Sequence, residues 1–280
     1  MAQLIIRNLP QNFYLTAPCA SGITIVFIHG WLLSGSYWLP LIELLQGYMQ
    51  CLSYDLRGFG RSPTGNLPHT LVSYVEDLRE MLDRLQLGKV WLMGHSLGGT
   101  IALWGGYLLG ERVQGIICLN SGGGIYIHRD FQRLRLAGRI ISYARPRWLL
   151  HLPWLPAQFT RDSVQTPLDL KWGKQRLLDL VSADLRSVLG ILLDSTTEKE
   201  VHFLPQLVAR LTQPVYFITG KQDQIMQTRF VKHLASFHYL WREGLENYWE
   251  LDNCGHIAML EQPQAVADLV LQVVSPQPLP

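Results

Sequence analysis

The feature that most constrains this chain is a strand–helix alternation that stops in the middle and then resumes. Short apolar runs rich in branched residues predict strands, and longer runs of helical period separate them. The predicted strands lie near residues 23–28, 50–54, 89–94, 113–120, 214–220 and 247–251. The predicted helices lie near residues 37–47, 70–85, 100–109, 228–236 and 263–274. Such an alternation is typical of an α/β domain, in which helices cover a largely parallel sheet.

The interruption predicts the domain organisation. From about residue 124 to residue 212 the patterns are helical, without a convincing strand. We therefore expect a core formed by residues 1–124 and 213–280, with a helical cap inserted at 125–212.

An additional pair of strands is predicted at the N-terminus. Two weaker apolar runs, near 3–8 and 12–17, precede the first core strand and are separated by Pro10–Asn12. We expect them to form an antiparallel hairpin at one edge of the sheet.

Composition excludes several classes of protein. With 280 residues, 48% of them hydrophobic, the chain can bury a large core without disulfides or metals. Charged residues make up only 16%, whereas about 25% is typical of soluble domains. The net charge of +2 provides no basic field for nucleic acid, so we expect no nucleic-acid partner.

The N-terminus and the cysteines bear on the location of the protein. The opening MAQLIIRNLP has no basic segment followed by a long apolar run, so no signal peptide is predicted. Cys19, Cys51, Cys118 and Cys254 show no metal-type spacing. We expect free thiols and a cytoplasmic location.

The strongest chemical signal is the segment Gly94-His95-Ser96-Leu97-Gly98-Gly99. It fits the pattern G-x-S-x-G and lies between a predicted strand and a predicted helix, which is the context that this motif requires. Glycines on either side of the serine avoid steric clashes at the sharp turn. We therefore predict that Ser96 is a nucleophile whose hydroxyl points into a cleft.

A serine nucleophile needs a base, and His256 is the histidine predicted for that role. It follows the strand near 247–251, and functional groups gather at the carboxyl ends of strands in open α/β sheets. Adjacent to Ser96, His95 is expected to point away from it and to pack. His29 is expected to shape the loop after the first core strand.

The base in turn needs a carboxylate that fixes its tautomer and stabilises the imidazolium. Asp223 follows the strand at 214–220 and is predicted to supply it; Glu250 and Asp252 are competitors nearer to His256 in the sequence. The order Ser96, Asp223, His256 is the chain order expected for this geometry.

Two backbone N–H groups should stabilise the oxyanion. We expect one from Leu97, directly after the nucleophile, and one from Trp31 in the segment His29-Gly30-Trp31-Leu32. The indole of Trp31 is expected to line the substrate pocket, together with residues of the cap.

Taken together, these motifs resemble those of the α/β-hydrolase fold superfamily. The resemblance is carried by the five segments His29-Gly30-Trp31, Asp55-Leu56-Arg57-Gly58-Phe59-Gly60-Arg61-Ser62, Gly94 to Gly99, Gly220 to Asp223, and Gly255-His256. It implies a mostly parallel, eight-stranded sheet flanked by helices, with a helical cap inserted after the sixth strand. The Asp55 to Ser62 segment is expected to support the site without taking part in the chemistry.

The resemblance also implies an activity. The segment HGWLLSGSYW is similar to that of serine esterases and cofactor-free perhydrolases, which need no metal, so we expect no cofactor. The implied substrate is a small apolar carboxylic ester. Family members that open epoxides or remove halides often use an aspartate nucleophile, and Ser96 argues against those activities.

Two alternatives remain open at this stage. The same three residues could cleave a carbon–carbon bond, or run a lyase reaction, on a carboxylate-bearing substrate held by cap arginines. The chain could also be a receptor with this fold that binds a small ligand under its cap.

The predicted cap has an unusual charge pattern. Residues 125–212 contain 13 Lys and Arg and 8 Asp and Glu, a net charge of +5. On a helical wheel for residues 127–144, Ile127, Phe131, Leu134, Gly138 and Ile141 share one side; the other mixes arginines with Leu136, Ile140 and Tyr143. A segment rich in Trp and Leu follows. This pattern favours packing over a pocket, with solvated arginines, or else peripheral contact with an anionic membrane or entry of a long-chain or prenyl-type ester under the cap.

Overall fold

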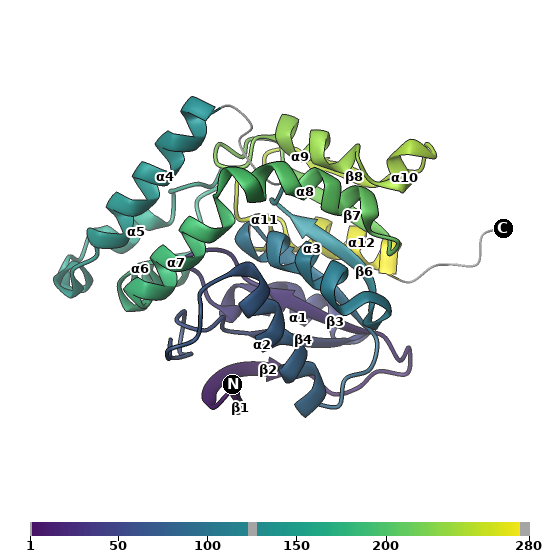
Figure 1. The fold of residues 1–280 in the computed structure, drawn as a ribbon. Coiled ribbons are helices and arrows are strands. Elements are labelled where there is room, and N and C mark those ends of the chain that lie inside the picture. Colours follow the sequence, from purple (N-terminus) through teal and green to yellow (C-terminus); the bar gives the residue numbers. More distant parts are fainter. Residues whose placement is uncertain (1, 123–127, 275–280) are drawn as a thin grey trace.

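The computed structural model describes residues 2–122 and 128–274, without the side chains of 128–131, 133 and 134. Within these residues, eight strands form a single sheet in the order β1-β2-β4-β3-β5-β6-β7-β8 (Figure 1). The strands are β1 (Ala2–Ile6), β2 (Leu9–Leu15), β3 (Thr24–Ile28), β4 (Gln50–Tyr54), β5 (Val90–His95), β6 (Val113–Leu119), β7 (Val215–Gly220) and β8 (Tyr248–Leu251). The six strands β4, β3, β5, β6, β7 and β8, which are neighbours in this order, run parallel to one another. Strand β1 pairs antiparallel with β2, and β2 pairs antiparallel with β4. The predicted mostly parallel sheet is confirmed.

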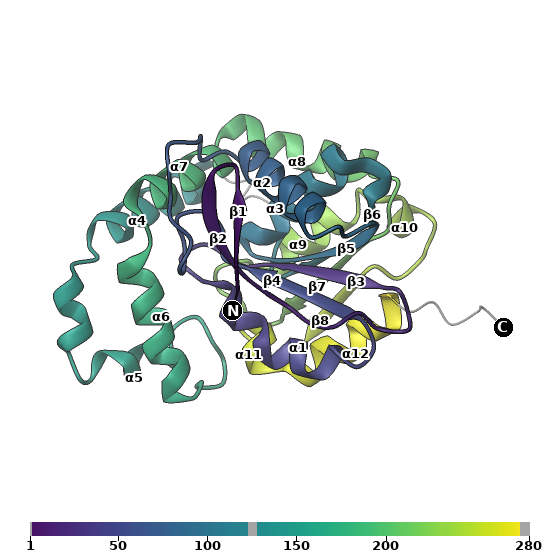
Figure 2. The same ribbon diagram turned by 90° about the horizontal axis from the view of Figure 1, so that it is seen from below.

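Helices cover both faces of this sheet (Figure 2). On one face lie α1 (Leu39–Leu45), α11 (Ala258–Glu261) and α12 (Pro263–Val274); on the other lie α2 (Leu71–Arg84), α3 (Leu97–Leu109), α8 (Glu198–Arg210) and α9 (Thr228–Ala235). Short elements complete these layers: η1 (Gly35–Trp38), η2 (Gly110–Arg112) and α10 (Tyr239–Arg242).

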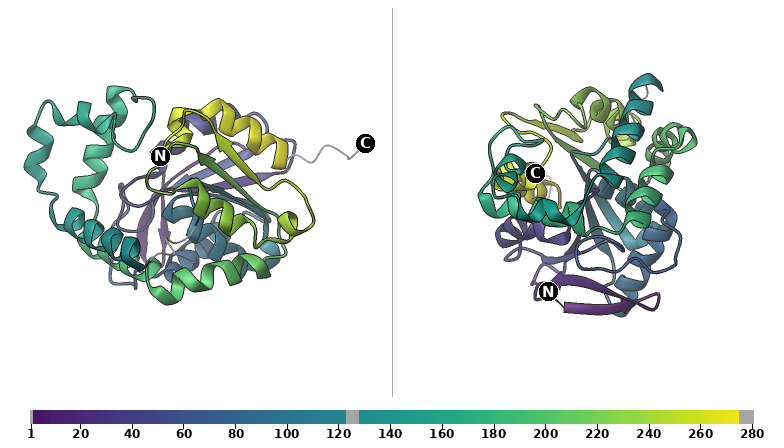
Figure 3. Two further views of the ribbon diagram at one scale, coloured as in Figure 1. Left: turned by 90° about the horizontal axis from the view of Figure 1, so that it is seen from above. Right: turned by 90° about the vertical axis from the view of Figure 1, so that its left-hand side faces the viewer.

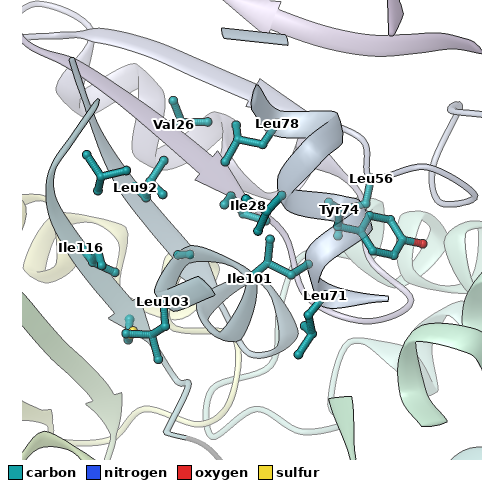
Figure 4. Packing of buried hydrophobic residues seen from close by; sticks show 14 of the residues in the cluster. Val26, Ile28, Leu56, Leu71, Tyr74, Leu78, Leu92, Ile101, Leu103 and Ile116 are labelled. Carbon is teal, nitrogen blue, oxygen red and sulfur yellow. The ribbon is translucent and has the colours of Figure 1, made fainter. Parts of the chain in front are cut away.

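The core shows why β3 reads as a continuous apolar run. Side chains alternate along a strand, so Ile25 and Phe27 pack with α1 and α12 while Val26 and Ile28 pack with α2 and α3. All these side chains are fully buried. A parallel strand covered on both faces must be apolar on both faces. Figure 4 shows the cluster on the face covered by α2 and α3, where Ile28 lies among side chains of neighbouring strands and of these two helices.

The described part of the segment between β6 and β7 consists of helices joined by loops and contains no strand. It consists of α4 (His128–Tyr143), η3 (Arg147–His151), α5 (Leu155–Phe159), α6 (Leu170–Ser182), α7 (Leu185–Ser195) and α8. Helices α4, α5 and α6 project beyond the sheet (Figure 3), whereas α8 buries Leu204, Leu207 and Val208 against the core. The predicted boundary at 124/125 lies outside the described residues. We call residues 128–212 the insertion.

The N-terminal hairpin forms, but with a different turn from the one predicted. Strand β2 begins at Leu9, and the turn is made by Arg7 and Asn8, whose φ angles are 47° and 65°. Two left-handed residues form the tight turn that matches the twist of a hairpin. Pro10, predicted to lie in the turn, instead lies in the strand opposite Ile5. The predicted turn at Pro10–Asn12 is therefore wrong.

The loop after β4 is held by a buried arginine. Arg57 is almost fully buried, and its Nε donates to Asp77 Oδ2 at 2.8 Å. Its other nitrogens donate to the carbonyl oxygens of Leu67 and Pro68 and to the hydroxyl of Ser73. These hydrogen bonds order the loop that follows β4.

We expect Arg57→Ala to destabilise the protein strongly. Removal of the guanidinium leaves Arg7 as the remaining ion-pair partner of the buried Asp77 carboxylate, and it leaves the carbonyl groups of Leu67 and Pro68 without their donor. Each buried group that loses its hydrogen bond costs about 1–3 kcal/mol. Urea unfolding measures this loss. In the matched control Arg84→Ala the exposed pair with Glu80 is lost, which should cost no more than about 1 kcal/mol. Equal losses in both variants would contradict the expectation.

Candidate active site

Ser96 lies at a sharp turn between β5 and α3. Its backbone angles, φ 52° and ψ −119°, fall outside the regions usual for a residue with a side chain. Its N–H donates to the carbonyl oxygen of Leu119 at 3.1 Å, which fixes the turn to the neighbouring strand β6. Strained backbone of this kind is typical of functional sites because it aims one side chain at a cleft.

Two glycines allow the chain to pack closely around Ser96. A Cβ at Gly98 would lie 2.1 Å from the carbonyl oxygen of Ile28, so only glycine lets α3 begin against the end of β3. A Cβ at Gly30 would lie 2.7 Å from His95 Nδ1 and 3.2 Å from Ser96 Cβ. The loop after β3 is therefore packed directly against the serine turn.

The structure brings His256 and Asp223 together from two loops at the carboxyl edge of the sheet. His256 Nδ1 lies 2.8 Å from Asp223 Oδ2, and the side chains are 10% and 0% exposed. Because the carboxylate can only accept, His256 Nδ1 carries the proton and Nε2 faces away from the pair. His256 and Ser96 both line the same cavity.

The Asp223 carboxylate is fully enclosed by donors. Its Oδ2 also accepts from Asn120 Nδ2 at 2.9 Å, and its Oδ1 accepts from the N–H groups of Ile225 and Met226, each at 2.8 Å. Burial alone would raise the pKa of Asp223, but the His256 ring and these hydrogen bonds lower the pKa to about 2. The carboxylate therefore stays charged across the physiological range.

Asn120 is a residue of the site that the sequence analysis did not identify. It directly follows β6, it is fully buried with φ 46°, and it also donates to the carbonyl oxygen of Gly255 at 3.0 Å. It thereby joins the aspartate loop to the histidine loop. The available signal was its position: an asparagine at the carboxyl end of a buried strand.

The competing carboxylates lie elsewhere. Asp252 pairs with Lys221 at 2.9 Å on the exposed surface, and Glu250 accepts from the hydroxyl of Tyr248 at 2.6 Å. His29 is buried and accepts at Nε2 from the N–H of Leu56, a contact that shapes its loop. Burial lowers the pKa of His29.

The side chain of His95 binds the main chain of His256. It is almost fully buried, and its Nε2 lies 2.7 Å from the carbonyl oxygen of His256, so this nitrogen must be the donor. Burial and then the neighbouring His256 ring lower the pKa of His95 to about 3. His95 is therefore neutral, and it holds the main chain of His256 in place.

The loop expected to supply an oxyanion donor is also tied to the insertion. Trp31 is half-buried, lines the cavity, and donates from its indole Nε1 to the carbonyl oxygen of Val188 at 3.1 Å. The next residue, Leu32, has φ 58°, a left-handed conformation unusual for leucine. Leu97 is the first residue of α3, where N–H groups lack partners within the helix.

A cavity of about 650 Å³ lies between the core and the insertion. Its walls are predominantly apolar. The apolar lining from the core comprises Trp31, Leu32, Leu33, Leu97, Ile225, Met226 and Ile257, and that from the insertion comprises Ala137, Ile140, Ile141, Ala144, Phe159, Leu180, Leu192, Val201 and Leu204. Such a cavity suits a small apolar ligand oriented by a few polar groups.

Among the residues whose side chains the structure describes, Arg176 is the arginine that lines the cavity, and it already binds other groups of the protein. The Nη1 atom of Arg176 donates to the carbonyl oxygens of Phe159 and Asp162, and its Nη2 pairs with Asp162 Oδ2 at 3.1 Å. The guanidinium side chain is only 9% exposed. Its charge is thus balanced by Asp162, and three of its N–H groups donate to other groups of the protein.

A single glutamate links the histidine loop to the insertion. The carboxylate of Glu261 accepts from the N–H groups of Gly255 at 3.0 Å and Ile257 at 3.2 Å, which flank His256. The same carboxylate accepts from the N–H groups of Gln165 at 2.7 Å and Thr166 at 3.3 Å. The sequence analysis did not identify this residue, and nothing local distinguishes it from a surface glutamate.

A second contact between core and insertion contains a titratable group. Asp179 of α6 is buried, and it accepts from the hydroxyl of Ser34 at 2.9 Å and from Gln175 Nε2 at 2.9 Å. Burial raises the pKa of Asp179 to about 7. Ser34 follows the Trp31 loop, so this contact lies close to the cavity wall.

Metal-binding clusters and membrane-spanning helices are both absent from the described residues. These residues contain no cluster of three or more His, Cys, Asp or Glu side chains that could hold a metal ion. No helix among residues 2–122 and 128–274 is long and apolar enough to cross a bilayer. All four cysteines are free thiols.

Comparison with known proteins identifies the family. Residues 25–269 match the alpha/beta hydrolase family, and the chain belongs to it. A protein of Enterobacter cloacae subsp. cloacae named as a carbamate hydrolase is 31% identical over 88% of this chain and 89% of its own. A soluble epoxide hydrolase of Corynebacterium is 24% identical over 94% and 93%. An esterase from Exiguobacterium antarcticum has the same fold, with a TM-score of 0.78 at 17% identity over 98% and 99% of the chains.

These relatives establish a hydrolase-fold enzyme. Their names refer to the cleavage of different bonds, so the choice among reactions depends on the residues of this chain.

We expect Glu261→Gln to slow the reaction of Ser96 by about tenfold, because the amide cannot accept all the N–H groups that the carboxylate holds and His256 loses its fixed position. The rate of labelling by a fluorophosphonate measures this effect. Glu250→Gln is the matched control and should react at the wild-type rate. An unchanged rate in Glu261→Gln would show that its hydrogen bonds do not position His256.

We also expect Asp179 to make stability depend on pH. Its folded-state pKa of about 7 exceeds the value near 3.9 of an exposed carboxyl, so the folded protein binds this proton more tightly than the unfolded chain. The resulting stability is fully present below about pH 4 and is lost as pH rises through about 7. Urea unfolding between pH 4 and 8 should show this decline, and Asp179→Asn should reduce it. The same slope in both proteins would contradict the expectation.

Proposed function

We propose that this protein is a serine hydrolase that cleaves small apolar carboxylic esters through an acyl-enzyme on Ser96. The observation that carries the proposal is the placement of His256: its Nδ1 is held by the charged Asp223 while the residue lines the cavity shared with Ser96. This is the arrangement that activates a serine hydroxyl.

The first step forms the acyl-enzyme. His256 Nε2 takes the proton of Ser96, and the serine oxygen attacks the ester carbonyl carbon. The N–H groups of Trp31 and Leu97 hold the negative oxygen that develops; each such donor is worth about 10²–10³ in rate. The imidazolium, stabilised by Asp223, then gives its proton to the departing alcohol.

The second step releases the acid. A water molecule enters, His256 takes its proton, and the hydroxide attacks the acyl carbon. The intermediate collapses and Ser96 leaves with the proton from His256. Asp223 remains charged throughout, as its lowered pKa requires.

The cavity lining supports a neutral, apolar substrate over a carboxylate-bearing one. Of the 27 described residues that line the cavity, 16 are apolar, two of the others (Asp162 and Glu200) are acidic, and the Arg176 charge is balanced by Asp162. A substrate carboxylate there would have to compete with Asp162 for Arg176 or remain unpaired, which is costly in a buried site. This observation favours ester hydrolysis over the carbon–carbon cleavage considered from the sequence.

We expect hydrolysis of p-nitrophenyl esters, with a preference for chains longer than acetate because a longer acyl group fills more of the apolar cavity. In Ser96→Ala the rate should fall by at least about 10³-fold. Ser195→Ala is the matched control, since Ser195 lines the same cavity but lies far along the chain from the turn; it should keep most of the activity.

Fluorophosphonate labelling separates the alternatives. Labelling that is lost in Ser96→Ala, together with ester turnover, supports the proposal. Labelling without ester turnover would indicate that the same residues cleave another kind of bond, such as a carbon–carbon bond. Neither labelling nor turnover would favour a ligand-binding protein.

A further inference from the structure

One segment of the insertion carries both unusual charge and unusual apolar exposure. We call residues 135–161, which include the described side chains at the end of α4 and continue through η3 and α5, the arm. The arm contains five arginines and neither aspartate nor glutamate in its sequence. Figure 3 shows that this region projects away from the sheet.

The arm also exposes large apolar side chains. Seven of the 17 exposed large apolar residues in the described part of the chain belong to it, although it makes up about a tenth of the sequence. They are Leu136, Ile140, Ile141, Tyr143, Trp148, Leu150 and Trp154. Such a concentration of exposed apolar side chains in one segment is typical of an interaction site.

Helix α4 arranges part of this surface as a stripe. Leu136, Ile140 and Tyr143 follow one another at helical spacing, and their exposed fractions are 60%, 59% and 67%. Arg139 and Arg147 are exposed beside them. Trp148 and Trp154, each 60% exposed, extend the apolar surface beyond the helix. Exposed tryptophan and leucine among arginines are typical of segments that lie in a membrane interface.

The arm is also a wall of the cavity. Ile140 and Ile141 line the cavity and are themselves substantially exposed, as is Ala144. The apolar stripe is therefore continuous with the cavity lining. A surface that contacts the arm would lie beside the route by which an apolar molecule reaches Ser96.

We propose that the arm docks on an anionic lipid bilayer, with its apolar side chains in the headgroup region and its exposed arginines Arg139, Arg147 and Arg161 on the lipid phosphates. Charge decides between this partner and a second copy of the chain. A symmetric contact would place arm against arm and bring like charges together, whereas an anionic bilayer neutralises them. The proposal does not depend on the bond that the enzyme cleaves.

Part of the segment from which the sequence suggested membrane contact lies outside the described residues and side chains. Ile127 is not among the described residues, and the side chains of Arg129, Phe131, Arg133 and Leu134 are not described.

The test is co-sedimentation of the full chain with vesicles of phosphatidylcholine alone or mixed with phosphatidylserine. We expect binding to the mixed vesicles to be at least about tenfold tighter than to neutral ones and to weaken as salt is raised. The double variant Trp148→Ser/Trp154→Ser should weaken binding by about tenfold or more. The double variant Arg139→Gln/Arg147→Gln should weaken it and reduce its dependence on salt.

Matched controls lie outside the arm, on α9, on α10 and in the loop that follows α10. Trp241→Ser/Leu245→Ser removes exposed apolar side chains, and Arg229→Gln/Arg242→Gln removes exposed charges, all outside the arm. Both should bind vesicles as the wild type does. Urea unfolding of each variant establishes that it is folded.

Three results would overturn the proposal. One is the absence of wild-type binding to phosphatidylserine vesicles at low salt. Another is binding that the arm variants and the control variants weaken equally. The third is a dimer, seen by sedimentation velocity without lipid, that Trp148→Ser/Trp154→Ser abolishes, which would assign the surface to a second copy. None of these results bears on Ser96, so the proposed activity is tested separately.

Discussion

The geometry of the site depends on one buried carboxylate. Asp223 can remain charged away from water only because donors from three loops surround it: the His256 ring, the Asn120 amide and the backbone after Asp223 itself. Each donor is fixed by the charge that it stabilises, so the loops after β6, β7 and β8 are held in one arrangement. The parallel sheet makes this possible because it places all these loops at the same edge.

The insertion is part of the same network. Its backbone accepts from His256 and Trp31, through the carbonyl oxygens of Ser163 and Val188, at 2.8 and 3.1 Å. The expected base and the expected oxyanion loop are therefore each tied to the segment that forms the cavity walls. Glu261 adds a further link. A movement of the insertion would displace His256 and the Trp31 loop relative to Ser96, whereas a rigid insertion holds them in position.

Much of this arrangement could be predicted from the sequence, for identifiable reasons. The parallel strands are buried on both faces and appear as continuous apolar runs, and the turn at Ser96 has a glycine pattern set by local sterics. Asn120 and Glu261 could not be predicted, because their roles arise from contacts over 103 and 96 residues of sequence. The hairpin turn was misplaced because a proline such as Pro10 usually indicates a turn. A strand at the edge of a sheet can contain proline, but the sequence does not show which strand lies at the edge.

The low charge content has a similar explanation. A sheet covered on both faces needs apolar strands, which removes charge from the core sequence. Several of the arginines that remain stabilise the fold: Arg57 and Arg176 are buried and bound by carboxylates and carbonyl groups. In the arm, Arg145 donates to the carbonyl oxygens of Ser142, Leu180 and Ala183, whereas Arg139 and Arg147 are exposed. The exposed charge of the arm lies on the segment that also supplies apolar side chains to the cavity wall, so an anionic surface attracted by this charge would meet the protein beside the cavity.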